Sequence, residues 1–208
     1  MEIIYTNDID CESVEWWIAV TKGADIVIHC AWYVEHGLYM ESSKNISSLH
    51  GLIKIAFGAL ESGVRKFIGI GTCLEYGDPF SISDKNISPS SLYASSKLSA
   101  FLILTQIFKN SNTKFLWCRL YYLYGEGEEP SRLVPYIKRQ LENDELVTHN
   151  NSSKMIDILE ITVAAKMILN ATLGDNHGAI DIRSNQTVSI RDFAKGIAKV
   201  MGKEWLIK

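Results

Sequence analysis

The sequence predicts an α/β fold in which a parallel sheet carries helices on both faces. Two observations support this. Apolar runs rich in β-branched residues alternate along the chain with segments whose apolar residues recur at helical spacing. The chain has 208 residues, of which 47% are hydrophobic, so it can bury a substantial core as one domain or as one domain with a small lobe.

The first part of the chain supplies most of the expected sheet. Strands are expected at "EIIYT" (2–6), "DIVIHCAW" (25–32), "KFIGIG" (66–71) and "KFLWCRLYYLYG" (114–125). Helices are expected at 12–20, at 47–63 and, after a turn-rich loop at 77–91, at 91–109. The helix at 47–63 has apolar residues three and four apart and ends at Gly63, which is a typical helix stop.

The pattern changes after Gly125, where helices dominate. Helices are expected at 131–143, 158–174 and 189–203, the last with Ser189 as its N-cap, and a short strand is expected at 178–184. These elements are predicted to form a small second lobe.

Composition and charge exclude several classes of function. The net charge of −3 and the absence of a basic run argue against nucleic acid as a partner. No apolar stretch approaches the roughly 18–20 residues needed to cross a bilayer, and "MEIIYTNDID" lacks the layout of a signal peptide. We therefore expect a cytoplasmic protein that does not bind membranes.

The cysteines and histidines do not form a metal-binding pattern. The four cysteines (Cys11, Cys30, Cys73, Cys118) are far apart, and we expect them to be reduced, buried thiols. The histidines have no metal-ligand spacing, so no metal is expected. His29 lies in an apolar run and is expected to be a strand residue with a hydrogen-bonded ring rather than a general base.

The stretch "SLYASSKLSAFLIL" places Tyr93 and Lys97 four residues apart, on one face of the expected helix. A free tyrosine is phenolate in only about one molecule in a thousand at pH 7. A nearby ammonium favours the phenolate, and lowering the pKa by about three units takes roughly 4 kcal/mol. A tyrosine tuned in this way can exchange a proton with a hydroxyl or carbonyl oxygen. The spacing alone is weak evidence, since it occurs by chance in many chains.

A threonine hydroxyl is expected beside this pair. Thr72 ends the strand of "FIGIGTCLEYG", at the carboxyl edge of the sheet, where open α/β sheets bind their ligands. The helix that begins with "YASSK" starts at the same edge. A hydroxyl donor, a phenol and a lysine are therefore expected to converge on one substrate oxygen.

These residues, in this order, resemble the extended short-chain dehydrogenase/reductase superfamily, in particular its NAD-dependent epimerase/dehydratase (nucleotide-sugar) branch. The resemblance implies a Rossmann-like doubly wound sheet, with a partial dinucleotide-binding domain at 1–125. Residues 126–208 would be mostly substrate-lobe segments, with some elements returning to the Rossmann core. It implies an enzyme that uses NAD or NADP to move hydride at a sugar carbon of a nucleotide-sugar, as an epimerase or a ketoreductase. Tyr93 would be the acid/base, Lys97 would tune it and bind the nicotinamide ribose, and Thr72 would polarise the substrate oxygen.

The resemblance also implies further binding residues. "NDID" is similar to the family's acidic turn, which makes Asp8 an adenine contact with Ile9 beside it. The end of "DIVIHCAW" would place Cys30, Ala31 and Trp32 along the cofactor.

Tyr122 stands where the family often has a substrate-binding asparagine, and Asp157 matches a family aspartate. In the family's 4,6-dehydratases, Asp and Glu follow the catalytic threonine. Here Cys73 and Leu74 take those places, which disfavours dehydration. Glu75 is one place further on and is expected to point elsewhere, because side chains alternate in extended backbone.

The glycine-rich phosphate loop of the family is also missing, since nothing similar to G-x-x-G-x-x-G precedes Asp8. The resemblance thus implies an N-terminally truncated sheet, without the residue by which the family distinguishes NAD from NADP. A partner chain could supply the missing strands, and the helices at 47–63 and 91–109 are expected to form a homodimer, as in the family. The alternative is a non-catalytic fragment that binds a nucleotide or a partner chain.

Overall fold

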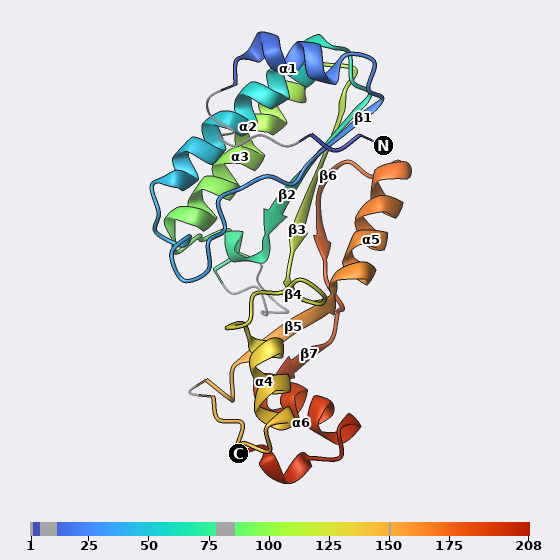
Figure 1. The fold of residues 1–208 in the computed structure, drawn as a ribbon. Helices are drawn as coiled ribbons and strands as arrows, with labels where there is room; N and C mark the ends of the chain where they lie inside the picture. Colours follow the sequence, from blue (N-terminus) through green and yellow to red (C-terminus); the bar gives the residue numbers. More distant parts are fainter. Residues whose placement is uncertain (1, 5–11, 78–85, 150) are drawn as a thin grey trace. The chain divides into compact units, whose positions relative to one another are not determined.

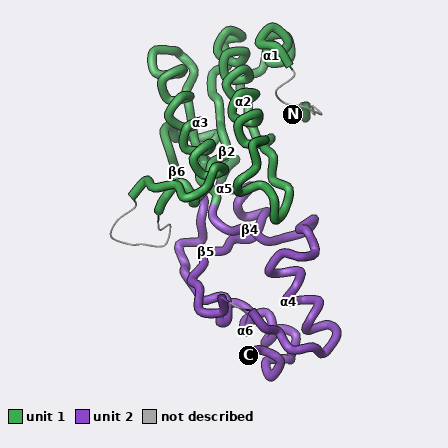
Figure 2. The backbone as a smooth tube through the Cα atoms, turned by 90° about the vertical axis from the view of Figure 1, so that its left-hand side faces the viewer, with its two compact units in different colours: residues 1–120, 168–181 green, residues 121–167, 182–208 purple. Residues whose placement is uncertain are grey.

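The computed structural model describes residues 2–4, 12–77, 86–149 and 151–208. The chain divides into two compact units (Figure 2). The first consists of Met1–Leu120 with Ile168–Asp181, and the second of Tyr121–Met167 with Ile182–Lys208.

The first unit contains a four-stranded sheet in the order β1-β2-β3-β6. Its strands are β1 (Ile26–His29), β2 (Lys66–Thr72), β3 (Lys114–Leu120) and β6 (Gly178–Ile182). The pairs β1–β2 and β2–β3 are parallel, and Gly69 of β2 lies opposite Trp117 of β3. The predicted α/β fold with a parallel sheet is therefore confirmed.

Three helices of this unit gather on one face of the sheet (Figure 1): α1 (Val14–Thr21), α2 (Lys44–Glu61) and α3 (Leu92–Phe108). The apolar positions of α2 at helical spacing, such as Leu52 and Ala56, are fully buried against Phe67 of the sheet and Leu104 of α3. Residues 168–173, at the end of α5 (Ile161–Leu173), lie on the opposite face. Both faces of the sheet are thus covered, as expected.

The second unit contains a smaller sheet in the order β4-β5-β7, with β4 (Tyr122–Tyr124), β5 (Met155–Glu160) and β7 (Thr187–Ser189). The helices α4 (Leu133–Glu142) and α6 (Ile190–Val200) and the 3-10 helix η2 (Glu204–Leu206) enclose its own apolar cluster. Ser189 is the N-cap of α6, because its hydroxyl accepts a hydrogen bond of 3.0 Å from Asp192 N. The predicted cap is confirmed.

Three predicted elements differ from the structure, and one strand was not predicted. The single strand expected at 114–125 is divided into β3 and β4, which belong to different sheets, because β3 pairs with β2 and β4 pairs with β5. The helix expected from residue 158 begins only at Ile161, since residues 158–160 belong to β5. β7 was not predicted. Residues 2–4 of the strand expected at 2–6 have no strand structure, and residues 5–6 lie outside the described residues.

Within the part of the chain that the structure describes, no helix has both the length and the apolar character needed to span a bilayer.

Candidate active site

Thr72 is the last residue of β2, at the carboxyl end of the parallel sheet. Its Oγ1 accepts a hydrogen bond from Leu74 N (3.3 Å), and its own N donates to Glu75 Oε1 (3.0 Å). These bonds form a capping box at the start of the 3-10 helix η1 (Cys73–Glu75). The extended backbone expected after Thr72 is therefore wrong, because the capping box turns the chain within three residues.

Tyr93 lies in the first turn of α3, which starts where the sequence predicts a helix. Ser91 caps this helix through a hydrogen bond from Ala94 N to its hydroxyl (3.1 Å). Tyr93 N donates to Met40 O (2.9 Å), and its ring meets the Tyr39 ring edge-on at 4.9 Å between centroids. The loop before α2 thus holds the half-buried Tyr93 on a second side.

Lys97 is one turn further along α3, and its side chain is buried, with 4% of the residue exposed. Its Nζ donates to Ile70 O of β2 (2.7 Å) and lies 3.8 Å from the centroid of the Trp32 ring. Nζ is 5.9 Å from the Tyr93 ring centroid. The structure therefore places Tyr93 and Lys97 on one face of α3, as the spacing predicts, but Lys97 bonds to the sheet.

The electrostatics of the pair differ from the sequence-based expectation. Burial raises the pKa of Tyr93 above its ordinary value, and the nearby Tyr39 adds to this, while a side-chain hydrogen bond with Thr72 acts in the opposite direction. Burial also lowers the pKa of Lys97 to about 7, against the opposing effect of Glu75 and Cys30. The lowered tyrosine pKa that we expected is thus wrong. Desolvation outweighs any help from the ammonium, so Tyr93 is a neutral phenol at pH 7.

The residues expected to lie along a cofactor follow β1. Cys30 and Ala31 are exposed, which corrects the expectation that Cys30 is buried, because β1 ends at His29 and the chain leaves the core there. Cys73 and Cys118 are buried, as expected. Trp32 packs on Lys97, and its Nε1 donates to Asn45 Oδ1 (2.8 Å). Asp8, Ile9 and Cys11 lie outside the described residues.

His29 is buried in β1, as expected, but its Nε2 has no hydrogen-bond partner among the described residues. Burial, together with the charge of Lys97, lowers the pKa of His29 to about 3. The ring is therefore neutral at physiological pH. The expected hydrogen bond at this nitrogen is absent from the described part of the chain.

Tyr122 and Asp157 belong to the second unit. Tyr122 OH accepts a hydrogen bond from Lys154 Nζ (3.2 Å). Asp157 is fully buried and binds Arg183 Nε (2.8 Å) and Ser184 N (2.8 Å), so it joins β5 to the segment after β6. These contacts indicate that Asp157 stabilises the fold of its unit.

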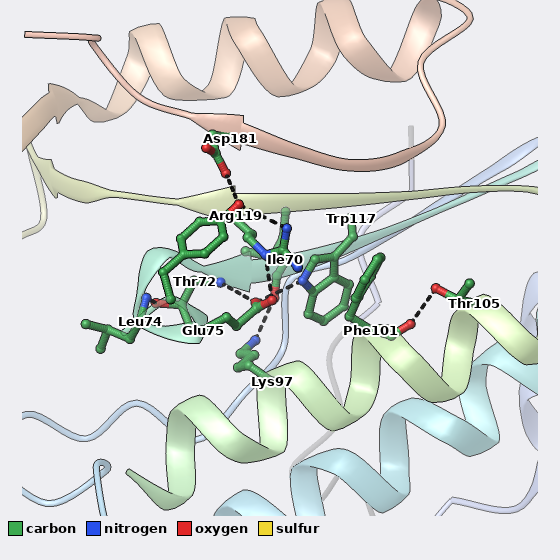
Figure 3. A network of polar contacts seen from close by, with 11 residues as sticks. Ile70, Thr72, Leu74, Glu75, Lys97, Phe101, Thr105, Trp117, Arg119 and Asp181 are labelled. Atoms are coloured by element: carbon green, nitrogen blue, oxygen red, sulfur yellow. Dashed lines mark hydrogen bonds and ion pairs between the residues drawn. The ribbon is translucent and has the colours of Figure 1, made fainter. Parts of the chain in front are cut away.

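A buried polar network is joined to the backbone of Thr72 through Glu75 (Figure 3). The sequence did not predict it. Glu75 is its centre and binds Trp117 and Arg119 of β3, while Tyr76 links Arg119 to Asp181 of β6. One observation could have revealed it. Glu75 and Arg119 are opposite charges within two otherwise mostly apolar runs, at 67–77 and 114–125.

This geometry defines an α/β protein with a phenol, a hydroxyl and a buried lysine at the carboxyl edge of a parallel sheet. Residues 4–179 match the family model described as "NAD dependent epimerase/dehydratase family". Because this match covers most of the chain, the protein belongs to the NAD-dependent epimerase/dehydratase family. The predicted family is confirmed. The comparison with curated proteins gives no match.

Solved structures share the fold. DesIV, a dTDP-glucose 4,6-dehydratase from Streptomyces venezuelae solved with NAD and DAU bound, is 18% identical with a TM-score of 0.80, over 96% of this chain and 63% of that one. A UDP-N-acetylglucosamine 4-epimerase from Methanobrevibacter ruminantium, in complex with UDP-N-acetylmuramic acid, is 17% identical with a TM-score of 0.79, over 96% and 66%. A UDP-glucose 4-epimerase from Thermotoga maritima, with UDP-glucose, is 18% identical with a TM-score of 0.80, over 96% and 68%. This chain thus spans about two thirds of the length of these proteins.

Proposed function

We propose that the protein is an NAD(P)-dependent epimerase or ketoreductase that moves hydride at a sugar carbon of a nucleotide-sugar. The observation that carries the proposal is the gathering of Thr72, Tyr93 and a buried Lys97 at the carboxyl end of β2. Membership of the family and the nucleotide-sugars bound by the similar structures support the class of substrate. The first unit would bind the dinucleotide, and the second, with Tyr122, would hold the sugar nucleotide.

The three residues divide the proton chemistry between them. Tyr93 is a neutral phenol, so it is suited to donate a proton to a carbonyl oxygen as that oxygen gains negative charge, and to recover the proton in the reverse direction. Thr72 supplies a hydroxyl for the same oxygen. The positive charge of Lys97 stabilises the phenolate that Tyr93 becomes after donating.

The residues present fit one end of a nicotinamide dinucleotide, which supplies the hydride when bound. An ammonium has three donors, and Ile70 O takes one of those of Lys97, so donors remain for ribose hydroxyl groups. Cys30 and Ala31 are exposed directly after β1, where parallel sheets bind their ligands. The proposed adenine contacts, Asp8 and Ile9, rest on the sequence alone.

The first experiment is calorimetric titration of the chain with NADH and NADPH, followed by assays with UDP- and dTDP-sugars. We expect binding of at least one dinucleotide. An epimerase would leave the bound cofactor unchanged over turnover, and a ketoreductase would consume it stoichiometrically. A folded chain that binds neither dinucleotide would contradict the proposal. Dinucleotide binding without turnover would favour a non-catalytic nucleotide-binding protein.

The acid/base role of Tyr93 is tested by Tyr93→Phe. Removing the phenol should lower kcat by about 10²- to 10⁴-fold, because positioned proton transfer contributes that much, while dinucleotide binding persists. Tyr33→Phe is the matched control, since the Tyr33 hydroxyl donates to Oε2 of the exposed Glu35 (2.8 Å). Unchanged turnover in Tyr93→Phe would exclude the role.

We also propose a homodimer through α2 and α3. These helices carry large apolar side chains that are exposed in the single chain: Ile46, Phe57, Leu102 and Ile103. Burying such side chains against a second copy is favourable. Light scattering should give twice the mass of the chain for the wild type, and Leu102→Glu should give the single mass. A wild-type chain that is monomeric at high concentration would contradict this.

A further proposal concerns the edge of the sheet. β1 has β2 on one side only among the described strands, and Ile28 is 41% exposed. An open apolar edge of this kind can accept a parallel strand, which we propose comes from a partner chain. Native mass spectrometry of the chain purified from its source would detect such a partner. Recovery of the chain in homo-oligomers alone would contradict it.

A further inference from the structure

Glu75 is a fully buried carboxylate at the end of η1, and three donors from two elements hold it. Its Oε1 accepts from Thr72 N (3.0 Å) and Trp117 Nε1 (2.9 Å), and its Oε2 accepts from Arg119 Nε (2.6 Å). Three hydrogen bonds of this kind restrict the Glu75 side chain to one conformation. Because one of the donors is the backbone of Thr72, the position of Glu75 determines that of Thr72.

Arg119 forms an ion pair with this carboxylate within the core. The guanidinium is 6% exposed, lies over the Tyr76 and Phe101 rings, and donates from Nη1 to Tyr76 OH (3.1 Å). Tyr76 OH in turn bonds Asp181 Oδ1 (3.0 Å). All these residues belong to the first unit. Residues of β3 and β6 thus connect to Glu75 through one chain of hydrogen bonds.

Lys97 approaches the same region from α3, on the other side of Glu75 (Figure 3). The groups that face its ammonium are Ile70 O, the Trp32 indole, Tyr93, and the titratable His29 and Cys30 at the end of β1. His29 is neutral at physiological pH, and Tyr93 is a phenol. Glu75 is thus the carboxylate that acts on Lys97, whose charge is otherwise costly to bury.

We propose that Glu75 is a positioning residue of the site, which fixes the backbone of Thr72 and supplies a buried negative charge that favours the ammonium form of Lys97. Its relevance to hydride transfer rests on the proposed function. The physical effect on Lys97 does not, because it requires no cofactor or substrate.

The test is a pH titration of the full chain, with lysines carrying ¹³C at Cε, followed by NMR. The Lys97 signal is assigned by its loss in Lys97→Met. In Glu75→Gln the titration midpoint of Lys97 should fall by about one pH unit or more, because an anion is removed and the Arg119 cation is left unpaired. Lys66, a second buried lysine with different neighbours, should titrate as in the wild type.

Asp157→Asn is the matched control, because it also removes a fully buried carboxylate paired with an arginine, in the second unit. It should leave Lys97 unchanged. An unshifted Lys97 in folded Glu75→Gln would overturn the proposal, as would an equal shift in Asp157→Asn.

If Glu75→Gln does not fold, Glu75→Asp tests the proposal instead, since it keeps the negative charge on a shorter side chain. The Lys97 midpoint should then stay within about half a unit of the wild type. A fall of about one unit or more in Glu75→Asp would overturn the proposal. If Glu75→Gln shifts the Lys97 midpoint but the wild-type chain binds no dinucleotide, the proposed function is contradicted. The inference about Glu75 and Lys97 then still holds.

Discussion

At the scale of single residues, the first unit buries two lysines and compensates their charges differently. Lys97 has one carbonyl and an indole face, and its pKa falls to about 7. Lys66 donates to three carbonyl oxygens, those of Ala171, Thr172 and Gly174, at 2.8 Å each. These lie at the C-terminus of α5, where the helix dipole favours a cation. Lys66 is therefore a structural lysine, while Lys97 keeps donors for a ligand.

Lys66→Met should destabilise the first unit by about 2 kcal/mol, because hydrogen bonds from a charged donor to the carbonyls at the end of α5 are lost. Chemical denaturation followed by tryptophan fluorescence measures this. The control is Lys114→Met, which removes an exposed ion pair with Asp175 and should cost less than about 1 kcal/mol. Equal effects of the two substitutions would contradict the role of Lys66.

The candidate site shows what single-residue patterns can and cannot predict. The convergence of Thr72, Tyr93 and Lys97 follows from their places at strand and helix ends, which local patterns indicate well. The raised pKa of Tyr93 does not follow, because it depends on burial and on Tyr39, which lies far away in the sequence. The role of Glu75 depends on how the turn after β2 faces the next strand, which the sequence does not show.

At the scale of elements, β2 and β3 are matched by side-chain size. Trp117 of β3 lies over the glycines of "GIG" in β2. A Cβ on Gly69 would lie 2.4 Å from the Trp117 ring, and one on Gly71 would lie 2.2 Å from Trp117 Nε1. The close approach brings Trp117 Nε1 within hydrogen-bond distance of Glu75. These glycines therefore serve packing between strands.

Gly69→Ala should destabilise the protein by about 3 kcal/mol, because the new methyl group overlaps a fully buried indole that cannot move aside. Thermal unfolding followed by circular dichroism gives the change. Gly196→Ala in α6 is the control: a Cβ there meets nothing within 4 Å, so the helix should be unchanged or slightly more stable. A neutral Gly69→Ala would show that β2 and β3 are packed differently.

Most elements of the fold were predictable, while breaks between elements were not. The run at 114–125 is mostly apolar and contains no glycine or proline before its end, so nothing local marks the break between β3 and β4. The break is a change of partner, because β3 pairs with β2 in one sheet and β4 pairs with β5 in the other. β5 and α5 follow one another without a linker, which made their boundary invisible as well.

At the scale of the whole molecule, stability should depend on pH through the groups whose pKa folding changes. Burial lowers the pKa of Lys97 to about 7, and of His29 to about 3, so the unfolded chain binds more protons than the folded one. Burial raises the pKa of Cys118 to about 12, which has the opposite consequence at high pH. The two effects act in different pH windows.

Between pH 7 and 9 the Lys97 contribution should dominate. A lysine is protonated in the unfolded chain up to a pKa of about 10.4, whereas folded Lys97 loses its proton from about pH 7 upward. Folding therefore releases a proton in this window, and the free energy of unfolding should rise with pH, by about 2 kcal/mol over the two units. Above pH 9 the thiols ionise more easily in the unfolded chain, and the rise should level off.

Urea denaturation at pH 7, 8 and 9, followed by the fluorescence of the tryptophans, tests this pH dependence, since four of the five tryptophans lie in the first unit. Lys97→Met has no proton to lose and should show a flat profile in the same window. A rise of the same size in Lys97→Met would assign the pH dependence to other groups and would contradict the lowered pKa of Lys97.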